Sequence, residues 1–432
     1  MNQKSFESID VALLRVGMYI ELELGWLAHP FPTSSFKITS PKQIDVIRSL
    51  GRSRIRWVPE KSELATESET AVATPDKPAA SGPADERARQ LAQEQVLRKQ
   101  RSELLGAQQR ELLACERRFS QTVRQYKQVV EQIHSKPLEV RSQCQEMVQG
   151  FVGEMLCSGE SAIRLLSDGM GDKLSMHPVN ISVISLLLGK YMALPAADLA
   201  DLGLAAFLHD IGKLQVADRV RWLDDSFSSA ELRAYQEHVT QSVLIAKRME
   251  LSAGALQAIA QHHEMVDGSG FPAHVKGDVM SLPAKILALV NRYEDLCNPS
   301  RPAAALTPHE ALALIFAQQK PRFDSSVLGA FIRMMGVYPP GSVVQLNDER
   351  YAMVVSVNSS RPLKPRVVVF DPKVPKHEAL VLDMETAPEL GIRRNLKPTS
   401  LPRAAMDYLS PRQRICYFFE RAVDTPIKES LA

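Results

Sequence analysis

The sequence is poor in several features that mark whole classes of protein. Its five cysteines are far apart, odd in number and never in a CxxC spacing. They therefore offer neither a disulfide framework nor a zinc knuckle, which fits a reducing compartment. No apolar run approaches the roughly 18 residues of a membrane span, and charged residues interrupt the N-terminal segment where a signal sequence needs a continuous apolar core. We therefore expect a cytoplasmic protein without membrane segments.

A large charge of either sign is also missing. The formal net charge is +2 over 432 residues, of which 24% are charged and 45% hydrophobic. This balance argues against a DNA-binding protein, although local groups of Lys and Arg can still hold phosphates. The chain is too long for one core, so we expect two to four domains.

The first sixty residues predict a small α/β module. Residues 18–24 alternate polar and apolar side chains, as a half-buried strand does. A helix follows, with Ser40 as its N-cap and Pro41 at its first position. We assign the module to residues 6–60. It carries no catalytic constellation, because His29 stands alone and is better explained by packing or surface exposure.

A segment with almost nothing to bury separates this module from a long helix. Residues 61–84 are rich in Ser, Thr, Ala, Pro and Glu, which predicts a flexible linker. Residues 85–137 then predict one long helix with a narrow apolar seam, a possible coiled coil, because apolar residues recur every seven positions. These residues are Leu105, Leu112, Phe119, Tyr126 and Ile133. The seam can pair with a second subunit, giving a homodimer, or with another helix of the same chain.

Residues 138–335 predict a domain that is almost entirely helical. Apolar residues at helical spacing run from Leu138 to Leu166. Capping boxes beginning at Ser228 and Thr307 open two further helices.

The pattern changes after the helical domain. Strand-like runs begin at Ser342, Tyr351 and Arg366. We expect a β-rich C-terminal extension and tail over residues 336–432, with residues 417–419 docked on one of the domains. The expected fold class is multidomain and mainly α, an all-helical domain flanked by a small N-terminal α/β module and a small β-rich C-terminal module.

Histidine gathers in the helical domain. His209 and Asp210 stand side by side, and five of the ten histidines fall within fewer than a hundred residues. An isolated His-Asp pair is more simply a buried hydrogen-bonded pair, but this clustering favours a metallo-phosphohydrolase. Imidazole and carboxylate ligands suit Fe, Mn, Ni or Zn, and one carboxylate can bridge two metals. The candidate ligands are His177, His209, Asp210, His238, His262, His263 and Asn291.

A second motif covers residues 262–272. Two adjacent imidazoles end a helix, and the turn from Asp267 to Gly270 lets the backbone approach a ligand closely. The alternative is an ordinary helix end with a glycine-rich turn and a chance histidine pair, which the spacing of the other candidate ligands disfavours.

On these residues the sequence closely resembles the HD-GYP family, a subgroup of the HD superfamily of metal-dependent phosphohydrolases that act on the bacterial second messenger cyclic di-GMP. Residues 209–213 resemble the HD motif, His238 the next ligand, and residues 262–272 the motif that names the group. The resemblance covers roughly residues 170–335. Residues 11–59 are similar to a module often found ahead of such domains.

The resemblance implies two divalent transition metal ions, Fe or Mn before Ni or Zn. One metal would be held by His177, His209, Asp210 and Asn291. The other would be held by Asp210, His238, His262 and His263. Asp210 and Lys213 would act in catalysis, with Lys213 meeting a phosphate oxygen. The implied substrate contacts are Lys213, Asp267, Gly268, Gly270, Phe271 and Arg301. The implied reaction is hydrolysis of cyclic di-GMP to pGpG, with GMP after a second round.

Three positions depart from the family's pattern. Asn291 stands where the family has aspartate, so the first metal should be held more weakly. Phe271 replaces the tyrosine of the naming motif, and Lys173 replaces a glutamate that serves a third metal in some members. Two other readings therefore stay open: a degenerate member with little or no activity that binds a nucleotide or protein partner as a regulator, and a hydrolase of other nucleotides.

Overall fold

The structure, a computed structural model, describes residues 7–24, 29, 31, 33–63, 83–157, 160–224, 226–358 and 361–421. The linker expected at residues 61–84 therefore lies for the most part outside the described residues. No helix among the described residues has the length and apolar character needed to cross a bilayer.

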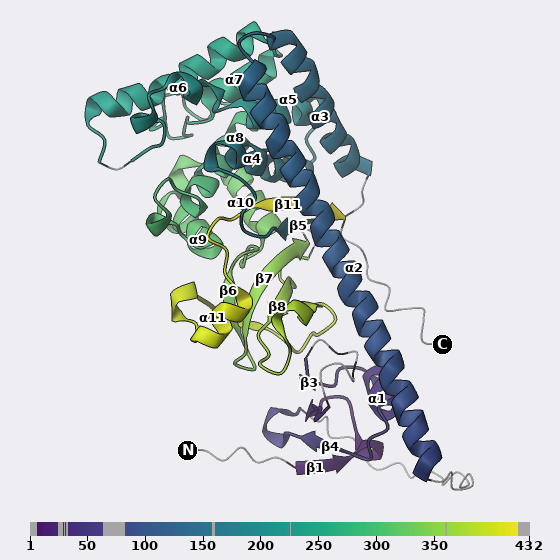
Figure 1. Cartoon of the computed structure of the whole chain (residues 1–432). Coiled ribbons are helices and arrows are strands. Elements are labelled where there is room, and N and C mark those ends of the chain that lie inside the picture. The colour runs from purple at the N-terminus through teal and green to yellow at the C-terminus, as the bar shows by residue number, and fades with distance from the viewer. Residues whose placement is uncertain are drawn as a thin grey trace.

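One long helix organises the molecule. Helix α2 (Pro83–Gln132) runs from the N-terminal module, past the C-terminal sheet, to the helical domain (Figure 1). From Phe119 onward, its predicted apolar seam packs against other parts of the same chain. Phe119, Tyr126 and Ile133 are buried, and α2 packs against helix α4 and strand β11. This half of the seam needs no second subunit, whereas Leu105 and Leu112 stay only half-buried.

The N-terminal module is a four-stranded antiparallel sheet in the order β1-β4-β2-β3, with one helix packed beside it. Its elements are β1 (Glu7–Asp10), β2 (Tyr19–Glu21), β3 (Ser35–Lys37), α1 (Pro41–Ser49) and β4 (Arg54–Trp57). The Ser40 hydroxyl caps α1 and Pro41 opens it, as predicted. His29 is buried, with Nε2 at 3.3 Å from Ser34 Oγ, so it is a packing residue. Leu97 of α2 completes this small core.

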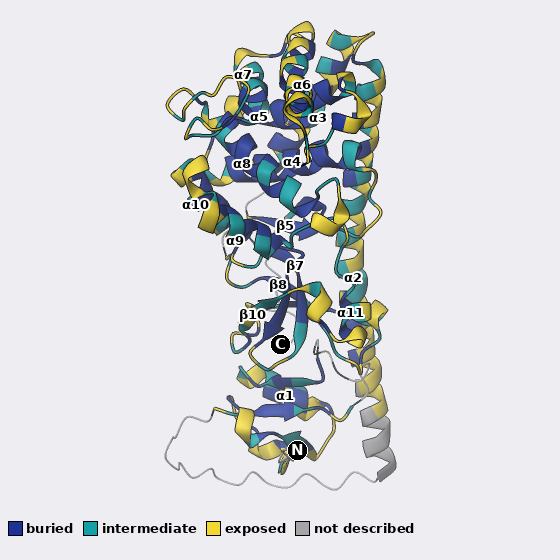
Figure 2. Ribbon diagram, turned by 90° about the vertical axis from the view of Figure 1, so that its left-hand side faces the viewer, coloured by how far each residue is buried: buried dark blue, intermediate teal, exposed yellow. Residues whose placement is uncertain are grey.

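The helical domain follows α2. Its helices are α3 (Pro137–Cys157), α4 (Lys173–Tyr191), α5 (Ala196–Leu208), α6 (Ser229–Arg248), α7 (Ala253–Gln261), α8 (Leu282–Cys297), α9 (Pro308–Gln318) and α10 (Ser325–Met335). Both predicted capping boxes are formed, at the starts of α6 and α9. The centre of the domain is α4, which is buried along almost its whole length and packs against α5 and α8 (Figure 2).

The prediction that helix α3 continues to Leu166 is wrong for the last residues. Helix α3 ends at Cys157, and strand β5 (Ser161–Leu165) follows with every residue buried. A short apolar run cannot be assigned to helix or strand by periodicity alone. This segment forms a strand because it pairs on both sides, with β7 and with β11.

The C-terminal extension forms most of a seven-stranded sheet, with the path β10-β6-β7-β5-β11 and with β8 and β9 joined at β7. Its further elements are β6 (Val343–Leu346), β7 (Tyr351–Asn358), β8 (Arg366–Val369), β9 (Val381–Asp383), β10 (Ile392–Leu396), α11 (Arg403–Leu409) and β11 (Tyr417–Arg421). The tail expected to dock does so as a strand, β11, alongside β5. Because β5 precedes α4 in the chain, the sheet and the helical domain share one continuous core.

Candidate metal centre

Four helices and their ends bring the predicted ligands together. His177 lies on α4 and His238 on α6, while His209 and His262 are the C-caps of α5 and α7. Asp210 follows His209 at the start of a 3-10 turn. The ligand atoms form two groups that share Asp210, and within each group they lie within 4.8 Å of one another. The first group is His177, His209 and Asp210, and the second group is Asp210, His238, His262 and His263.

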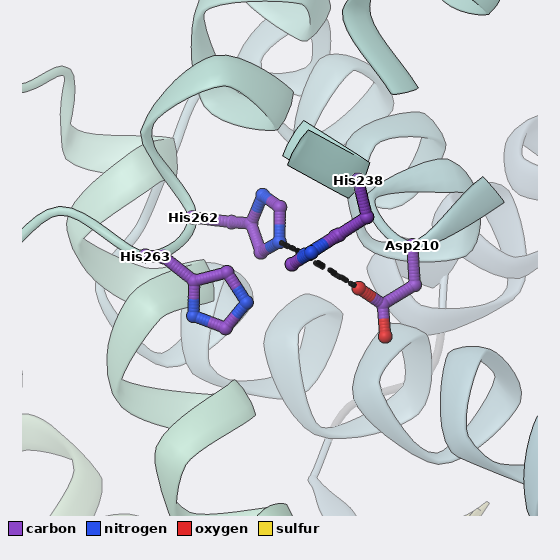
Figure 3. Close-up of side chains that lie close together, drawn as sticks. All are labelled: Asp210, His238, His262 and His263. Carbon is purple, nitrogen blue, oxygen red and sulfur yellow. Dashed lines mark hydrogen bonds and ion pairs between the residues drawn. The ribbon is translucent and has the colours of Figure 1, made fainter. Parts of the chain in front are cut away.

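The carboxylate of Asp210 lies between the two groups. Oδ2 is 3.3 Å from Nε2 of His177 and 3.5 Å from Nε2 of His209. Oδ1 is 3.4 Å from Nε2 of His238 and 3.7 Å from Nε2 of His262. Figure 3 shows the second group, with the imidazoles of His238 and His262 turned toward the carboxylate. Each oxygen therefore faces a different set of imidazoles.

Hydrogen bonds fix the tautomer of three of these imidazoles. Nδ1 of His209, His238 and His262 donates to the backbone carbonyl three residues earlier, at 2.8, 2.5 and 2.6 Å. With the proton on Nδ1, Nε2 presents its lone pair to the centre. Nε2 of His238 and Nε2 of His262 then face each other at 3.3 Å without a proton between them. Two buried acceptors this close repel each other, and a cation bound by both would remove that cost, so this donor set fits a metal.

His177 is oriented by a carboxylate that the motifs did not indicate. Its Nδ1 lies 2.5 Å from Oε2 of Glu294, and its Nε2 lies 3.2 Å from Nε2 of His209. Burial lowers the pKa of His177, but the carboxylates of Glu294 and Asp210 outweigh it and raise the pKa to about 9. A sequence signal existed: Glu294 is one helical turn after Asn291 and so shares its face of α8.

Burial keeps three of the other imidazoles neutral, those of His209, His238 and His263. Burial lowers the pKa of His209 and His263 well below the ordinary value. It also lowers the pKa of His238, to about 3. Burial raises the pKa of Asp210, but Lys213 and His209 outweigh that effect and hold the pKa well below its usual range. These three neutral imidazoles and the ionised carboxylate are in the protonation states that bind metals, whereas His177 must first lose a proton.

Asn291 is suited to a ligand role, which stays a prediction. It is buried on α8, and its Oδ1 accepts no hydrogen bond from the part of the chain that the structure describes. A buried oxygen without a donor is costly unless something else satisfies it. Its amide oxygen would ligate without adding negative charge.

Two lysines border the centre. Lys213 is buried, with Nζ 2.6 Å from Oδ2 of Asp210, and its expected contact with a phosphate oxygen stays a prediction. Lys173, the departure from the family's glutamate, places Nζ 3.8 Å from Oδ1 of Asp295. Both ammonium groups also lie against the ring of Trp222, at 4.5 and 4.3 Å from its centroid. Trp222 was missed, because nothing in the local sequence links it to the ligands.

The glycine-rich turn packs directly against the second group. A Cβ at Gly270 would lie 2.4 Å from Cα of Glu264, so only glycine fits there. Gly268 has φ of +81°, which also favours glycine. Phe271 stacks on His263 with ring centroids 4.5 Å apart and an interplanar angle of 21°. This turn therefore borders the centre as expected.

A buried carboxylate holds the turn in place. Oε1 of Glu264 accepts from the backbone N–H of Ala273 at 2.7 Å, and Oε2 accepts from that of Val275 at 3.2 Å. Tyr235 supports the same side, with its hydroxyl 3.4 Å from Nε2 of His263.

Two expected substrate contacts point elsewhere in this structure. Oδ1 of Asp267 accepts from the backbone N–H and the hydroxyl of Ser269, at 2.9 and 2.6 Å, so it shapes its own turn. Arg301 is 61% exposed and pairs with Asp224 at 3.3 Å. The structure brings neither side chain to the metal ligands.

Two family models match the chain. The one described as an HD domain matches residues 158–327, and the one described as a domain of unknown function (DUF3391) matches residues 7–143. The second match includes the whole of α2, so that model joins the N-terminal sheet and the long helix in one unit.

Curated relatives fall in one class of enzyme. The cyclic di-GMP phosphodiesterase PA4108 of Pseudomonas aeruginosa is 24% identical over 84% of this chain and 84% of its own length. The 3'3'-cGAMP-specific phosphodiesterase 3 of Vibrio cholerae is 28% identical over 38% of this chain and 35% of its own length. Among solved structures, Bd1817, an HDG"Y"P protein from Bdellovibrio bacteriovorus, covers 76% of this chain and 98% of its own at 13% identity, with a TM-score of 0.41. That last likeness is too remote to support an inference.

The HD domain match contains every predicted ligand, and the geometry gathers five of its histidines around one aspartate. The resemblance seen in the sequence is thereby confirmed, and the enzyme class it implies, phosphodiesterase, is that of the relatives. The chain therefore contains an HD domain, matched over residues 158–327, with a DUF3391 module matched ahead of it over residues 7–143.

Proposed function

We propose that the protein is a metal-dependent phosphodiesterase that hydrolyses cyclic di-GMP to pGpG and, in a second round, to GMP. The observation that carries this proposal is the shared carboxylate of Asp210, with one oxygen facing His177 and the other facing His238. A carboxylate placed in this way suits a bridge between two cations, and paired cations are a recurring device for phosphodiester hydrolysis.

The donor set divides between two divalent cations, with Fe or Mn as the first candidates. His177, His209, Asp210 and Asn291 would hold one, and Asp210, His238, His262 and His263 the other. When bound, such a pair supplies Lewis acidity to the phosphoryl oxygens and activates water as the nucleophile. The Nδ1 hydrogen bonds described above keep each Nε2 aimed at the centre, and Glu294 does the same for His177.

Lys213 would act on the substrate directly. Its buried ammonium lies beside Asp210, where a phosphodiester bound at the centre would place an oxygen. A cation in a buried site stabilises negative charge that grows on the phosphoryl oxygens during attack. Because Lys213 already pairs with Asp210, it needs no rearrangement to do so.

The nature of the substrate is supported by the relatives. The curated relatives include phosphodiesterases named for cyclic di-GMP and for 3'3'-cGAMP, both cyclic dinucleotides. We propose cyclic di-GMP as the substrate because the relative named for it is similar over 84% of this chain. The 3'3'-cGAMP-specific relative matches 38% of it.

The second candidate function is that of a regulator with little or no turnover, and Asn291 favours it. An amide in place of a carboxylate removes one negative charge from the first cation's ligands, which lowers the affinity for a dication. The side chain is nonetheless buried, and its Oδ1 accepts no hydrogen bond from the described residues.

A turnover assay separates these functions. Wild type, Asn291→Asp and Asp210→Ala are loaded with Mn²⁺ or anaerobically with Fe²⁺ and given cyclic di-GMP, 3'3'-cGAMP or pGpG. If the protein is a phosphodiesterase, the rate at which wild type hydrolyses cyclic di-GMP should be far above that of Asp210→Ala. If wild type stays at that background while Asn291→Asp gains activity, the regulator is the correct function. Preference for 3'3'-cGAMP would replace the substrate but keep the enzyme class.

A further inference from the structure

The ligands of the metal centre are enclosed, so a substrate must enter past partly exposed neighbours. His177, His209, Asp210, His238 and His262 are between 0 and 3% exposed. Two aromatic side chains that touch this centre are only half-buried, Phe271 and Trp222. They therefore border the route by which a phosphodiester reaches the ligands.

These two aromatic rings stand at different halves of the centre. Phe271 stacks on His263, which belongs to the group formed with His238 and His262. Trp222 meets His177, of the other group, with ring centroids 6.3 Å apart and an interplanar angle of 84°. Because the groups share one carboxylate, the two rings flank the place where a bound phosphodiester would lie.

The indole of Trp222 is placed by contacts at its base. It follows the 3-10 turn Asp218–Val220, and Val220 is 2% exposed. Nε of Arg221 donates to the carbonyl of Lys213 at 3.2 Å, which ties this segment to the turn that carries Asp210. The ring is thus held near the centre by its neighbours in sequence, while its own surface is partly open.

The charges around the ring match the chemistry of a nucleotide. The ammonium groups of Lys173 and Lys213 lie 4.3 and 4.5 Å from its centroid. Both ammonium groups lie over the ring, so a base would stack on the part of the indole that they leave open while the cations meet the phosphate.

We propose that Trp222 contacts the substrate and that its indole stacks on a purine base of the cyclic dinucleotide at the His177 half of the centre. Phe271 then faces the second base at the other half. A ligand with two bases on one ring of phosphodiesters thus meets an aromatic surface on each side. This inference rests on the proposed function, because it takes the substrate class from it.

The test compares side chains of similar bulk in the full chain loaded with Mn²⁺. Trp222→Phe keeps a flat aromatic face, whereas Trp222→Leu keeps apolar volume without one. Stacking predicts that KM for cyclic di-GMP rises about tenfold or more in Trp222→Leu and stays within about threefold in Trp222→Phe, because a base loses roughly 1–3 kcal/mol without an aromatic surface. Leu223→Ala, at a 47% exposed neighbour, should leave KM unchanged.

A binding readout accompanies the kinetics. Trp222 is one of three tryptophans, so cyclic di-GMP should quench intrinsic fluorescence in wild type and in Trp57→Phe but not in Trp222→Phe. Equal KM values in Trp222→Leu and Trp222→Phe, or quenching that survives in Trp222→Phe, would overturn the stacking role. Neither turnover nor quenching in wild type would instead reject the proposed function, and the stacking role with it.

Discussion

Glu294 and His177 form a buried pair that connects the C-terminal strand to the metal centre, with Oε2 and Nδ1 2.5 Å apart. The other oxygen of Glu294 accepts from Nδ2 of Asn298 at 2.8 Å. Asn298 also exchanges two hydrogen bonds with the backbone of Ile415, both 2.8 Å long. Ile415 lies just before β11, so a segment distant in sequence helps to orient a ligand on α4.

Replacing Glu294 with glutamine should lower the affinity for the cation at His177. The amide oxygen can still accept from Nδ1, but the charge that makes the imidazole a strong donor is lost. Changes in such supporting groups typically cost about 10- to 100-fold in metal affinity. Titration of metal-free protein with Mn²⁺ measures the loss, and Glu131→Gln, at an exposed carboxylate on α2, is the matched control. Equal affinities in the two variants would contradict this role of Glu294.

Cation binding at His177 should release a proton. Glu294 and Asp210 raise the pKa of His177 to about 9, so the imidazole is protonated at neutral pH and its Nε2 proton must leave before a metal binds. Affinity at this position should therefore rise as the pH increases toward 9, whereas His238, with a pKa of about 3, adds no such dependence. Calorimetry in two buffers with different ionisation enthalpies counts the proton. Glu294→Gln should release fewer protons per bound cation. If wild type released none, the charged pair of His177 and Glu294 would be excluded.

Removing Asn298 should destabilise the fold as well as the centre. Asn298→Ala leaves the buried backbone N–H of Ile415 without its partner and removes one of the two donors to its carbonyl, the other being Nδ2 of Asn180. Each buried unsatisfied group costs about 1–3 kcal/mol, so the free energy of unfolding should fall by a comparable amount. Urea unfolding measures it. A variant as stable as wild type would show that β11 does not depend on this link.

Gly270 should tolerate no side chain. A Cβ there would lie 2.4 Å from the backbone of both Glu264 and Met265, so Gly270→Ala must shift the turn that carries Phe271. Overpacking of this kind costs about 1–3 kcal/mol, and thermal unfolding should show it together with a loss of turnover. Gly150→Ala is the control, because a Cβ at that helical position meets nothing within 4 Å. Similar melting temperatures for the two variants would refute the steric account.

Local chemistry let the sequence predict much of this arrangement. The capping residues before α1, α6 and α9 act within a few residues, so the starts of those helices were predicted correctly. The cluster of histidines with Asp210 in the sequence indicated a metal centre, and the structure brings those side chains together.

The features that were missed depend on contacts between distant segments. Strand β5 is a short segment that forms a strand because it pairs with β7 and β11, far along the chain. Glu294 and Trp222 belong to no motif and become meaningful only when α4, α8 and the loop after α5 meet. The spacing of Glu294 from Asn291 placed both on one face of a helix, but periodicity and spacing do not show which distant segments that face meets.

The most direct test of the central claim is the metal content of the anaerobically purified protein, measured by elemental analysis alongside circular dichroism. A carboxylate shared between two groups of imidazoles predicts two transition metal ions per chain in wild type and a loss of both in Asp210→Ala with the helical signal retained. A folded wild-type protein that retains no metal after incubation with Fe²⁺ or Mn²⁺ would contradict the account.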